Sequence, residues 1–389
     1  MNDPLAFCDD ELRRLAEDSL LREIRSMDSP QDPVVTLDGE RLILLASNNY
    51  LGLANDPRVV AAAAEAAARW GAGAGSARLI SGGVRLHDEL EARLAAFKGT
   101  EAALLFSSGY LANLGTISAL VGAGDAIFSD ELNHASIIDG ARLSRAAVHV
   151  WRHADPEDLA SLLREHGAAR RKLVVTDTIF SMDGDLAPLP AIVEACERAG
   201  AILMVDEAHA TGVVGPAGRG AVAHFGLEGR VPVIMGTLSK ALGSAGGYIA
   251  GSATLVSYLR NRARAFIFDT APPAPVAAAA LAALEVLERE PYRPQRARAL
   301  AARLAAGLRE NRFDVPEPDA AIVPVSAGTA EAALALSAAL RRLGVLVPAI
   351  RPPSVPAGTA RLRATVMATH EGAHIDAAVR AFAGARVAV

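Results

Sequence analysis

Two polar segments in the middle of the chain each follow an apolar run, in positions where an enzyme could use their side chains together. The first apolar run ends in Asp206, with His209 three residues further on, and the second leads through Thr237 to Lys240. An acidic group at the end of a buried strand is costly without a partner, and a lysine amine held in a cleft can form a Schiff base. Solvent-facing strand ends are the alternative. Because an acid and a lysine follow consecutive strands, a catalytic site is favoured over that alternative.

A third segment is suited to binding phosphate. The apolar run 102–106 is followed by Ser108, Gly109 and Tyr110, which open a helix. Backbone N–H groups at the start of a helix bind anions, and the helix dipole favours negative charge there. No Lys-Ser/Thr pair follows the glycine, so this is not the loop of a nucleoside triphosphatase. The glycines near 71–75 follow a helix, not a strand, which argues against a dinucleotide fingerprint.

The fourth candidate is His134, between two further apolar runs. A lone histidine is more often structural than catalytic, but beside an aromatic cofactor an imidazole can stack on the ring and transfer protons. A phosphate cradle, a histidine, an aspartate and a lysine together match what pyridoxal 5′-phosphate needs. Lysine forms the Schiff base, and the aspartate keeps the pyridine nitrogen protonated.

The elements that would position these residues alternate between short apolar runs and segments of helical period. This order predicts a mostly parallel sheet with helices on both faces, with the functional loops at the carboxyl ends of the strands. The predicted strands are 102–106, 126–128, 148–151, 173–176, 201–205, 231–235 and 248–251. The predicted helices of this region include 56–69, 111–120, 158–166, 192–198 and 276–288.

The two ends of the chain carry their own pattern. The spacing of leucines predicts an N-terminal helix over 9–25, capped by Asp9 or Asp10, and this helix would contain Arg22. A smaller C-terminal α/β unit is expected, with strands near 321–325, 346–350 and 360–365 and helices at 295–310, 329–343 and 375–382. The expected domains are an N-terminal helical segment (1–52), a large domain (53–287) and a small domain (288–389).

Composition excludes several classes of protein. The 389 residues are 51% hydrophobic and 21% charged with a net charge of −5, so most of the chain should fold, and no basic stripe suggests a nucleic-acid partner. No apolar run approaches the roughly 20 residues that span a bilayer, and the acidic N-terminus is unlike a signal peptide. Cys8 and Cys196 offer neither a disulfide framework nor a zinc site. A cytoplasmic enzyme is expected, with no membrane partner.

The chain resembles the α-oxoamine synthases, pyridoxal-phosphate enzymes of the aspartate-aminotransferase-like fold (fold type I), over nearly its whole length. The expected fold is therefore α/β, with a mostly parallel large-domain sheet and a smaller C-terminal α/β domain. The segments that carry the resemblance are 47–53, 75–78, 108–113, 133–136, 180–184, 206–212, 237–240 and 270–273.

The resemblance implies a role for each matching residue. Lys240 would carry the cofactor and remove the α-proton of an amino acid, Asp206 would pair with the pyridine nitrogen, and His209 would contact the phenolic oxygen. The other cofactor contacts it implies are His134 on the ring face, Ser181 close by, the phosphate contacts Ser108, Gly109, Tyr110 and Thr237, and Thr270 toward the cofactor of a second subunit. The implied substrate contacts are Arg22, Asn48, His134, Ser354 and Arg363, with Arg25 close enough to Arg22 to confuse that assignment.

Family members join an amino acid to an acyl thioester, lose carbon dioxide and release an amino ketone. The stretch 349–363, with Arg351 before two prolines, is similar to the members that join L-alanine to a pimeloyl thioester in biotin synthesis, although those usually have Thr where this chain has Ser354. The resemblance also implies a homodimer with shared active sites, and leaves open whether the thiol carrier is coenzyme A or an acyl carrier protein. The alternatives are a sister enzyme that uses glycine or serine, and a regulator that borrows the fold.

Overall fold

The computed structural model describes residues 3–388, and the chain divides into two compact units. The large unit is Asn48–Arg298, and the small unit combines Met1–Ser47 with Ala299–Val389. The first 47 residues thus group with the C-terminal part, whereas the sequence predicts a separate segment over 1–52. The boundaries at 52 and 287 stay a prediction.

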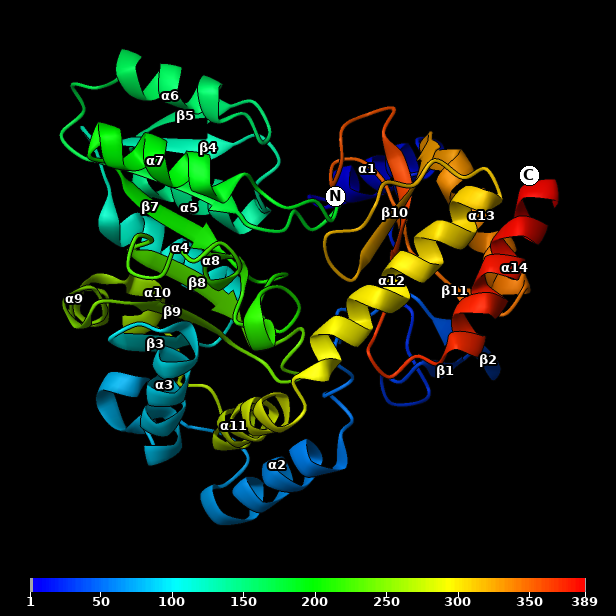
Figure 1. Cartoon of the computed structure of the whole chain (residues 1–389), viewed down its shortest axis with the longest axis horizontal. Helices are drawn as coiled ribbons and strands as arrows, with labels where there is room; N and C mark the ends of the chain where they lie inside the picture. Colours follow the sequence, from blue (N-terminus) through cyan, green and yellow to red (C-terminus); the bar gives the residue numbers. More distant parts are fainter. Residues whose placement is uncertain (1–2, 389) are drawn as a thin grey trace. The chain divides into compact units, whose positions relative to one another are not determined.

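A seven-stranded sheet forms the centre of the large unit (Figure 1). Its order is β3-β9-β8-β7-β6-β4-β5, and only β9 runs against its neighbours. This confirms the expected mostly parallel sheet. The strands are β3 (Ala102–Phe106), β4 (Ala126–Asp130), β5 (Ala147–Trp151), β6 (Lys172–Asp177), β7 (Ile202–Asp206), β8 (Val233–Thr237) and β9 (Gly247–Gly251).

The central strands are buried on both faces, which is why they are apolar without interruption. On one face, Ile127, Leu173 and Met204 pack in a single cluster with residues of α4, α5, α9 and α10. The residues that alternate with them, such as Val174 and Leu203, are buried as well. The sheet is therefore a rigid platform whose loops are free to carry polar groups.

Helices α2, α4, α5, α6 and α9 of the large unit begin after a residue whose side chain caps them. The Asp56 side chain accepts a hydrogen bond from Arg58 N at 3.1 Å, and Pro57 opens helix α2 (Pro57–Trp70), which confirms the predicted helix. The other helices are α3 (Arg85–Lys98), α4 (Gly109–Leu120), α5 (Ala135–Ser144), α6 (Pro156–Glu165), α7 (Leu189–Ala199), α8 (Ala221–His224), α9 (Ala253–Arg262), α10 (Arg264–Ile267) and α11 (Ala274–Arg289), with the short turns η1 (Arg78–Gly82) and η2 (Pro216–Gly218). Helix α12 (Tyr292–Glu310) contains the point at which the two units divide.

The small unit has two three-stranded sheets, ordered β1-β2-β11 and β10-β13-β12. The strands are β1 (Val34–Leu37), β2 (Glu40–Leu44), β10 (Ile322–Gly328), β11 (Val345–Leu346), β12 (Ala349–Ile350) and β13 (Ala360–Thr365). Helices α13 (Ala330–Arg342) and α14 (Gly372–Ala388) complete it. The single strand expected over 346–350 is wrong, because Pro348 has no N–H to donate and separates two short strands.

The N-terminal helix differs from the prediction. Helix α1 (Ala6–Glu17) begins after Leu5, so Asp9 and Asp10 do not cap it. The chain leaves the helix at Ser19, whose φ is +57°, and Leu20 N and Leu21 N both bond to Leu15 O. Arg22 is therefore not helical, and the predicted helix over 9–25 is too long. The leucine spacing suggested a helix face that packs against the core, but α1 has no buried residue, so this spacing was a misleading signal.

Among residues 3–388, no helix combines the length and the apolar character that crossing a bilayer requires.

Candidate active site

The carboxyl ends of the parallel strands meet along one edge of the large sheet, and a cavity of about 220 Å³ lies there. Segments that follow β3, β4, β6, β7 and β8 all contribute to it. The lining residues are Ser108, Gly109, Tyr110, Asn113, His134, Ser136, Asp177, Asp206, Ala208, His209, Met235, Thr237, Ser239 and Lys240. The cavity therefore brings together eight of the residues that the sequence singled out for the cofactor.

Lys240 lies at one end of a chain of hydrogen bonds. Its Nζ is 2.8 Å from His209 Nε2, and His209 Nδ1 is 2.7 Å from the Tyr50 hydroxyl. Tyr50 in turn donates to Asn48 Oδ1 at 3.1 Å. Because Tyr50 donates onward, its oxygen accepts from His209 Nδ1, which leaves Nε2 to accept from the lysine. The chain fixes both the orientation and the tautomer of His209 beside the amine.

Asp206 ends β7 and is 3% exposed. One carboxylate oxygen accepts from Ala208 N at 2.8 Å, and the other accepts from Asn113 Nδ2 at 2.7 Å. Asn113 Nδ2 also lies 2.9 Å from Ser136 Oγ, and its buried Oδ1 has no hydrogen-bond partner among residues 3–388. Asp206 is thus held rigidly at the cavity wall.

A second buried carboxyl group, Asp177, pairs in register with Asp206 at the end of the neighbouring strand. Burial and the negative charge of Asp206 raise the pKa of Asp177 well above its ordinary value. Its Oδ2 accepts from His134 N at 2.8 Å, which anchors the loop after β4 to the sheet. The wall therefore carries an acidic pair, a natural place for a cationic ring nitrogen.

His134 caps α5, with its Nδ1 2.7 Å from Ser136 Oγ. Burial lowers the pKa of this imidazole below its ordinary value, and Lys240 lowers it further, although Asp206 acts in the opposite sense. The neutral ring that results is suited to stacking on an aromatic ligand.

The phosphate cradle predicted at Ser108 and Gly109 lies at the start of α4. Ser108 Oγ accepts from Leu111 N at 3.1 Å and so caps the helix. A Cβ at Gly109 would lie 2.9 Å from Met235 Cε, so no larger residue fits without movement. Leu111 N and Ala112 N are bonded to Ser108, so the N–H groups of Gly109 and Tyr110 are the ones at this helix start that are available to an anion. Thr237 donates to Gly246 O at 2.9 Å, which holds its side chain at this end of the cavity.

Not every predicted residue lies at the cavity. Ser181 follows β6, and Thr270 is exposed after α10, but neither lines it. Arg22, Ser354 and Arg363 belong to the small unit, where Arg363 is buried on β13.

The sequence also missed residues that line the cavity or support it: Tyr50, Asn113, Ser136, Asp177 and Ser239. Asp177 carried the same signal as Asp206, an acid at the end of an apolar strand. Asn113 is four residues after Gly109 and so lies on the same face of α4.

A buried ion pair lies next to the cavity, at Glu207, the residue that follows Asp206. Lys98 Nζ is 2.6 Å from Glu207 Oε2, and both side chains are at most 1% exposed. Lys98 also donates to Thr211 Oγ1 at 2.9 Å and to Arg219 O at 2.8 Å, and Glu207 Oε1 accepts from Val222 N. Burial lowers the pKa of Lys98, but Glu207 and Tyr248 outweigh it and raise that pKa above its ordinary value.

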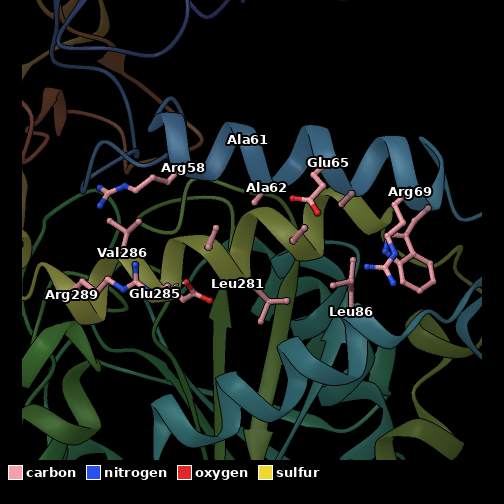
Figure 2. Close-up of a pocket in the computed structure, with 14 residues that line it drawn as sticks. Arg58, Ala61, Ala62, Glu65, Arg69, Leu86, Leu281, Glu285, Val286 and Arg289 are labelled. Atoms are coloured by element: carbon pink, nitrogen blue, oxygen red, sulfur yellow. Dashed lines mark ion pairs between the residues drawn. The ribbon is translucent and has the colours of Figure 1, made fainter.

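A larger hollow of about 480 Å³ runs between α2 and α11 (Figure 2). Two of its arginines are paired locally, Arg289 with Glu285 at 3.7 Å and Arg58 with Glu290 at 2.6 Å. No lysine or histidine lines it, and among residues 3–388 no group of three or more His, Cys, Asp or Glu is placed to hold a metal ion. The chemistry therefore belongs to the smaller cavity.

The comparisons agree with this geometry. The model of the family "Aminotransferase class I and II" matches residues 40–382. The chain belongs to the class I and II aminotransferase family. Over 373 residues it is 56% identical to the 8-amino-7-oxononanoate synthase of Anaeromyxobacter dehalogenans, covering 96% of this chain and 94% of that protein.

Two solved structures of similar proteins extend the comparison. A serine palmitoyltransferase variant from S. paucimobilis with a bound PLP–myriocin aldimine is 34% identical, with a TM-score of 0.94 and coverage of 100% of this chain and 99% of that chain. The 8-amino-7-oxononanoate synthase of Francisella tularensis is 26% identical, with a TM-score of 0.76 and coverage of 88% and 97%. The expected fold and family are confirmed.

Pyridoxal phosphate is the cofactor of this family member, and the cavity fits it. A lysine amine beside His209 suits an aldehyde, the buried Asp206 suits a protonated ring nitrogen, and the Gly109 cradle suits a phosphate. The three groups belong to different strand ends around one cavity.

Proposed function

We propose that this chain condenses L-alanine with a pimeloyl thioester to give 8-amino-7-oxononanoate, carbon dioxide and a free thiol, the condensation of biotin biosynthesis. The relative from Anaeromyxobacter dehalogenans, at 56% identity over nearly the whole chain, supports this substrate pair. The observation that carries the chemistry is the Lys240 amine, 2.8 Å from His209 Nε2, in a cavity that the buried Asp206 also lines.

The reaction makes and breaks few bonds. The α-carbon of alanine loses a proton and forms a bond to the thioester carbonyl carbon, and the C–S bond breaks to release the thiol. The bond from the α-carbon to the carboxylate then breaks to release carbon dioxide, and a proton returns to that carbon. Pyridoxal phosphate, when bound, withdraws electrons from the α-carbon and so stabilises the negative charge that these steps place there.

Residues of the cavity have distinct roles in this proposal. Lys240 binds the cofactor and carries the α-proton, and His209 orients its amine and meets the phenolic oxygen. Asp206 stabilises the protonated ring nitrogen, and His134 packs on the ring face. The phosphate is held by Ser108, Gly109, Tyr110 and Thr237, with Ser181 near the ring and Thr270 serving a second subunit.

Replacement of the lysine tests the reaction directly. Lys240→Ala should lower kcat by at least about 10³-fold, because the base and the covalent anchor are lost together. Thiol release with L-alanine and pimeloyl-CoA measures the rate, and intact mass after borohydride reduction reports whether cofactor stays attached. Lys172→Ala, which removes a lysine outside the cavity, serves as control. Turnover by Lys240→Ala at the parental rate would refute the proposal.

Asn48 and Arg363 are the proposed contacts of the amino acid. Asn48 ends the hydrogen-bond chain that starts at Lys240, and Arg363 offers a fork of donors that matches a carboxylate.

The acyl chain is assigned to Arg22 and Ser354, and the small unit supports this with a second guanidinium. Arg351 donates to the carbonyls of Ser19 and Leu21, and Arg22 donates to Pro352 O at 3.5 Å. Burial lowers the pKa of Arg351, and the nearby charge of Arg22 lowers it further. No described carboxylate pairs with either guanidinium, so the two cations form a site for an anion such as the free carboxylate of a pimeloyl chain.

Arg22→Gln should therefore raise the KM for pimeloyl-CoA about 10-fold or more, as expected for loss of a charged hydrogen bond. The KM for heptanoyl-CoA, of equal length without the carboxylate, should hardly change. Arg25→Gln is the matched control on the same segment. Equal changes for the two thioesters, or a larger effect of Arg25→Gln, would contradict the assignment.

The second candidate is condensation of L-serine with a long acyl thioester. The TM-score of 0.94 with a serine palmitoyltransferase favours it, but that identity is 34%, against 56% for the alanine-using relative. An uncharged alkyl chain also has no anionic group that the guanidinium groups of Arg22 and Arg351 could bind.

A homodimer with shared sites is part of the proposal. Exposed apolar side chains support it on the large unit, where Ile80 is 80% and Phe268 is 70% exposed. They lie on adjoining segments, because Ala77 and Thr270 form a β-bridge. Sedimentation of the parent chain should show a dimer. An acyl carrier protein as thiol carrier and a cytoplasmic location stay predictions.

A further inference from the structure

His153 lies between two carboxylates that belong to different active-site loops of the large unit. Its Nδ1 is 3.0 Å from Asp130 Oδ1, and its Nε2 is 2.9 Å from Asp185 Oδ2. His153 itself follows the edge strand β5, Asp130 ends β4, and Asp185 lies in the loop between β6 and α7. Three segments that are distant in sequence are thus joined at one imidazole.

The environment favours the doubly protonated ring. Both nitrogens face ionisable oxygens, so both donate. Burial lowers the pKa of His153, but the hydrogen bonds and charges of Asp130 and Asp185 outweigh this and raise it to about 10. The side chain of Asp130 is fully buried and that of His153 is 22% exposed. The imidazole and the Phe180 ring also pack at right angles, with 4.3 Å between centroids.

Asp130 and Asp185 each organise the loop that carries them, Asp130 through its carboxylate and Asp185 through its main-chain carbonyl. The Asp130 side chain accepts from Leu132 N at 2.9 Å, just before His134, and from Ala154 N at 3.0 Å, next to His153. The main chain of Asp185 accepts from Phe180 N at 3.1 Å and closes a tight turn that contains Ser181. The second oxygen of Asp185, Oδ1, is buried without a hydrogen-bond partner among residues 3–388, so His153 supplies the side chain's only described hydrogen bond.

We propose that His153 is a positioning residue, which clamps the loop after β6 to the loop after β4 and thereby holds Ser181 and His134 in place at the cofactor. The mechanism does not otherwise use this cluster, and none of its three members lines the cavity. The relevance of the clamp to catalysis rests on the proposed roles of Ser181 and His134. The existence of the clamp does not depend on those roles, because the hydrogen bonds of His153 join the two loops whatever Ser181 and His134 do.

Other charges around His153 are few. Glu131, beside Asp130, accepts from His153 N at 3.0 Å. On its own segment, Arg152 is paired with Asp155 at 2.9 Å and with Asp158 at 3.5 Å. The carboxylates of Asp130 and Asp185 are therefore the groups whose interaction with the ring depends on its charge.

Hydrogen exchange of the cofactor-loaded protein tests the clamp. In His153→Gln, peptides covering 178–187 and 131–136 should exchange about 10-fold faster or more, while peptides of β7 and β8 keep their parental rates. His149→Gln is the matched control, since His149 lies on β5, the strand that His153 follows, and stacks on His166 with 3.6 Å between ring centroids. Parental exchange in both loops, or equal acceleration across the whole large unit, would overturn the proposal.

A second variant separates the two loops. Asp185→Asn keeps the Asp130 contact, so exchange should accelerate in 178–187 but not in 131–136. This variant also decides the matter if His153→Gln does not fold. Acceleration of both loops to the same extent would contradict a clamp that works through His153.

The pH dependence gives an independent readout. The raised pKa means that the clamp is complete below the ordinary value of 6.5 and is lost as pH rises through about 10. The difference in loop exchange between parent and His153→Gln, corrected for intrinsic rates, should therefore shrink between pH 7 and 10. A constant difference would contradict a charged clamp. These readouts hold even if the substrates prove to be others than alanine and a pimeloyl thioester.

Discussion

Asp206 and Lys240 could be found from the sequence because each follows an apolar run, and an ionisable group is conspicuous there. Asn113 could not, because an amide in the middle of a helical stretch looks like any polar residue on a surface. Only the fold shows that Asn113 Nδ2 is 2.7 Å from Asp206 Oδ2 and fully buried. Functional residues that act through another residue thus leave little trace in sequence pattern.

The geometry makes Asn113 testable. Asn113→Ala removes a hydrogen bond to a buried carboxylate, worth about 1.5–3 kcal/mol, and should weaken pyridoxal phosphate binding about 10- to 100-fold. Cofactor titration followed by absorption measures this. Asn261→Ala, on the surface of α9, is the control. Parental cofactor affinity in Asn113→Ala would show that the contact does not position Asp206.

At the scale of elements, strands were predicted well because those buried on both faces are short apolar runs bounded by polar residues. The run 102–106 matches β3, and 360–365 matches β13. Helices such as α3 were missed, since four of its fourteen residues are buried polar or weakly apolar groups, His87, Glu91, Ala95 and Lys98. Three of these bond to distant partners, which periodicity does not reveal: Lys98 to Glu207, Glu91 to Leu105 N at 2.9 Å, and His87 to Pro272 O at 2.7 Å.

The Lys98–Glu207 pair joins α3 to the loop after β7, and its removal should be costly. Lys98→Met leaves a buried carboxylate without its cation and should lower the free energy of unfolding by about 3–5 kcal/mol. Adding Glu207→Gln should restore part of that loss, because the uncompensated charge is gone. Urea unfolding of the parent, the single and the double variant measures both effects. A single variant as stable as the parent would contradict this account.

At the scale of the whole molecule, the order of elements indicated a mostly parallel sheet, and the sheet order β3-β9-β8-β7-β6-β4-β5 confirms it. The reversed strand β9 was not anticipated, because an apolar run does not reveal its direction. Residues 1–47 group with the C-terminal part, a long-range association that local pattern does not contain. The fold class was thus predictable, whereas the grouping of distant segments was not.

The most direct test of the central claim is thiol release by the purified, cofactor-loaded chain with each pair of L-alanine, glycine or L-serine and pimeloyl-CoA or palmitoyl-CoA. We predict that L-alanine with pimeloyl-CoA gives the highest kcat/KM, by about 10-fold or more, with a product whose mass is that of 8-amino-7-oxononanoate. Preference for L-serine with palmitoyl-CoA, or no thiol release with alanine and the pimeloyl thioester, would contradict the account.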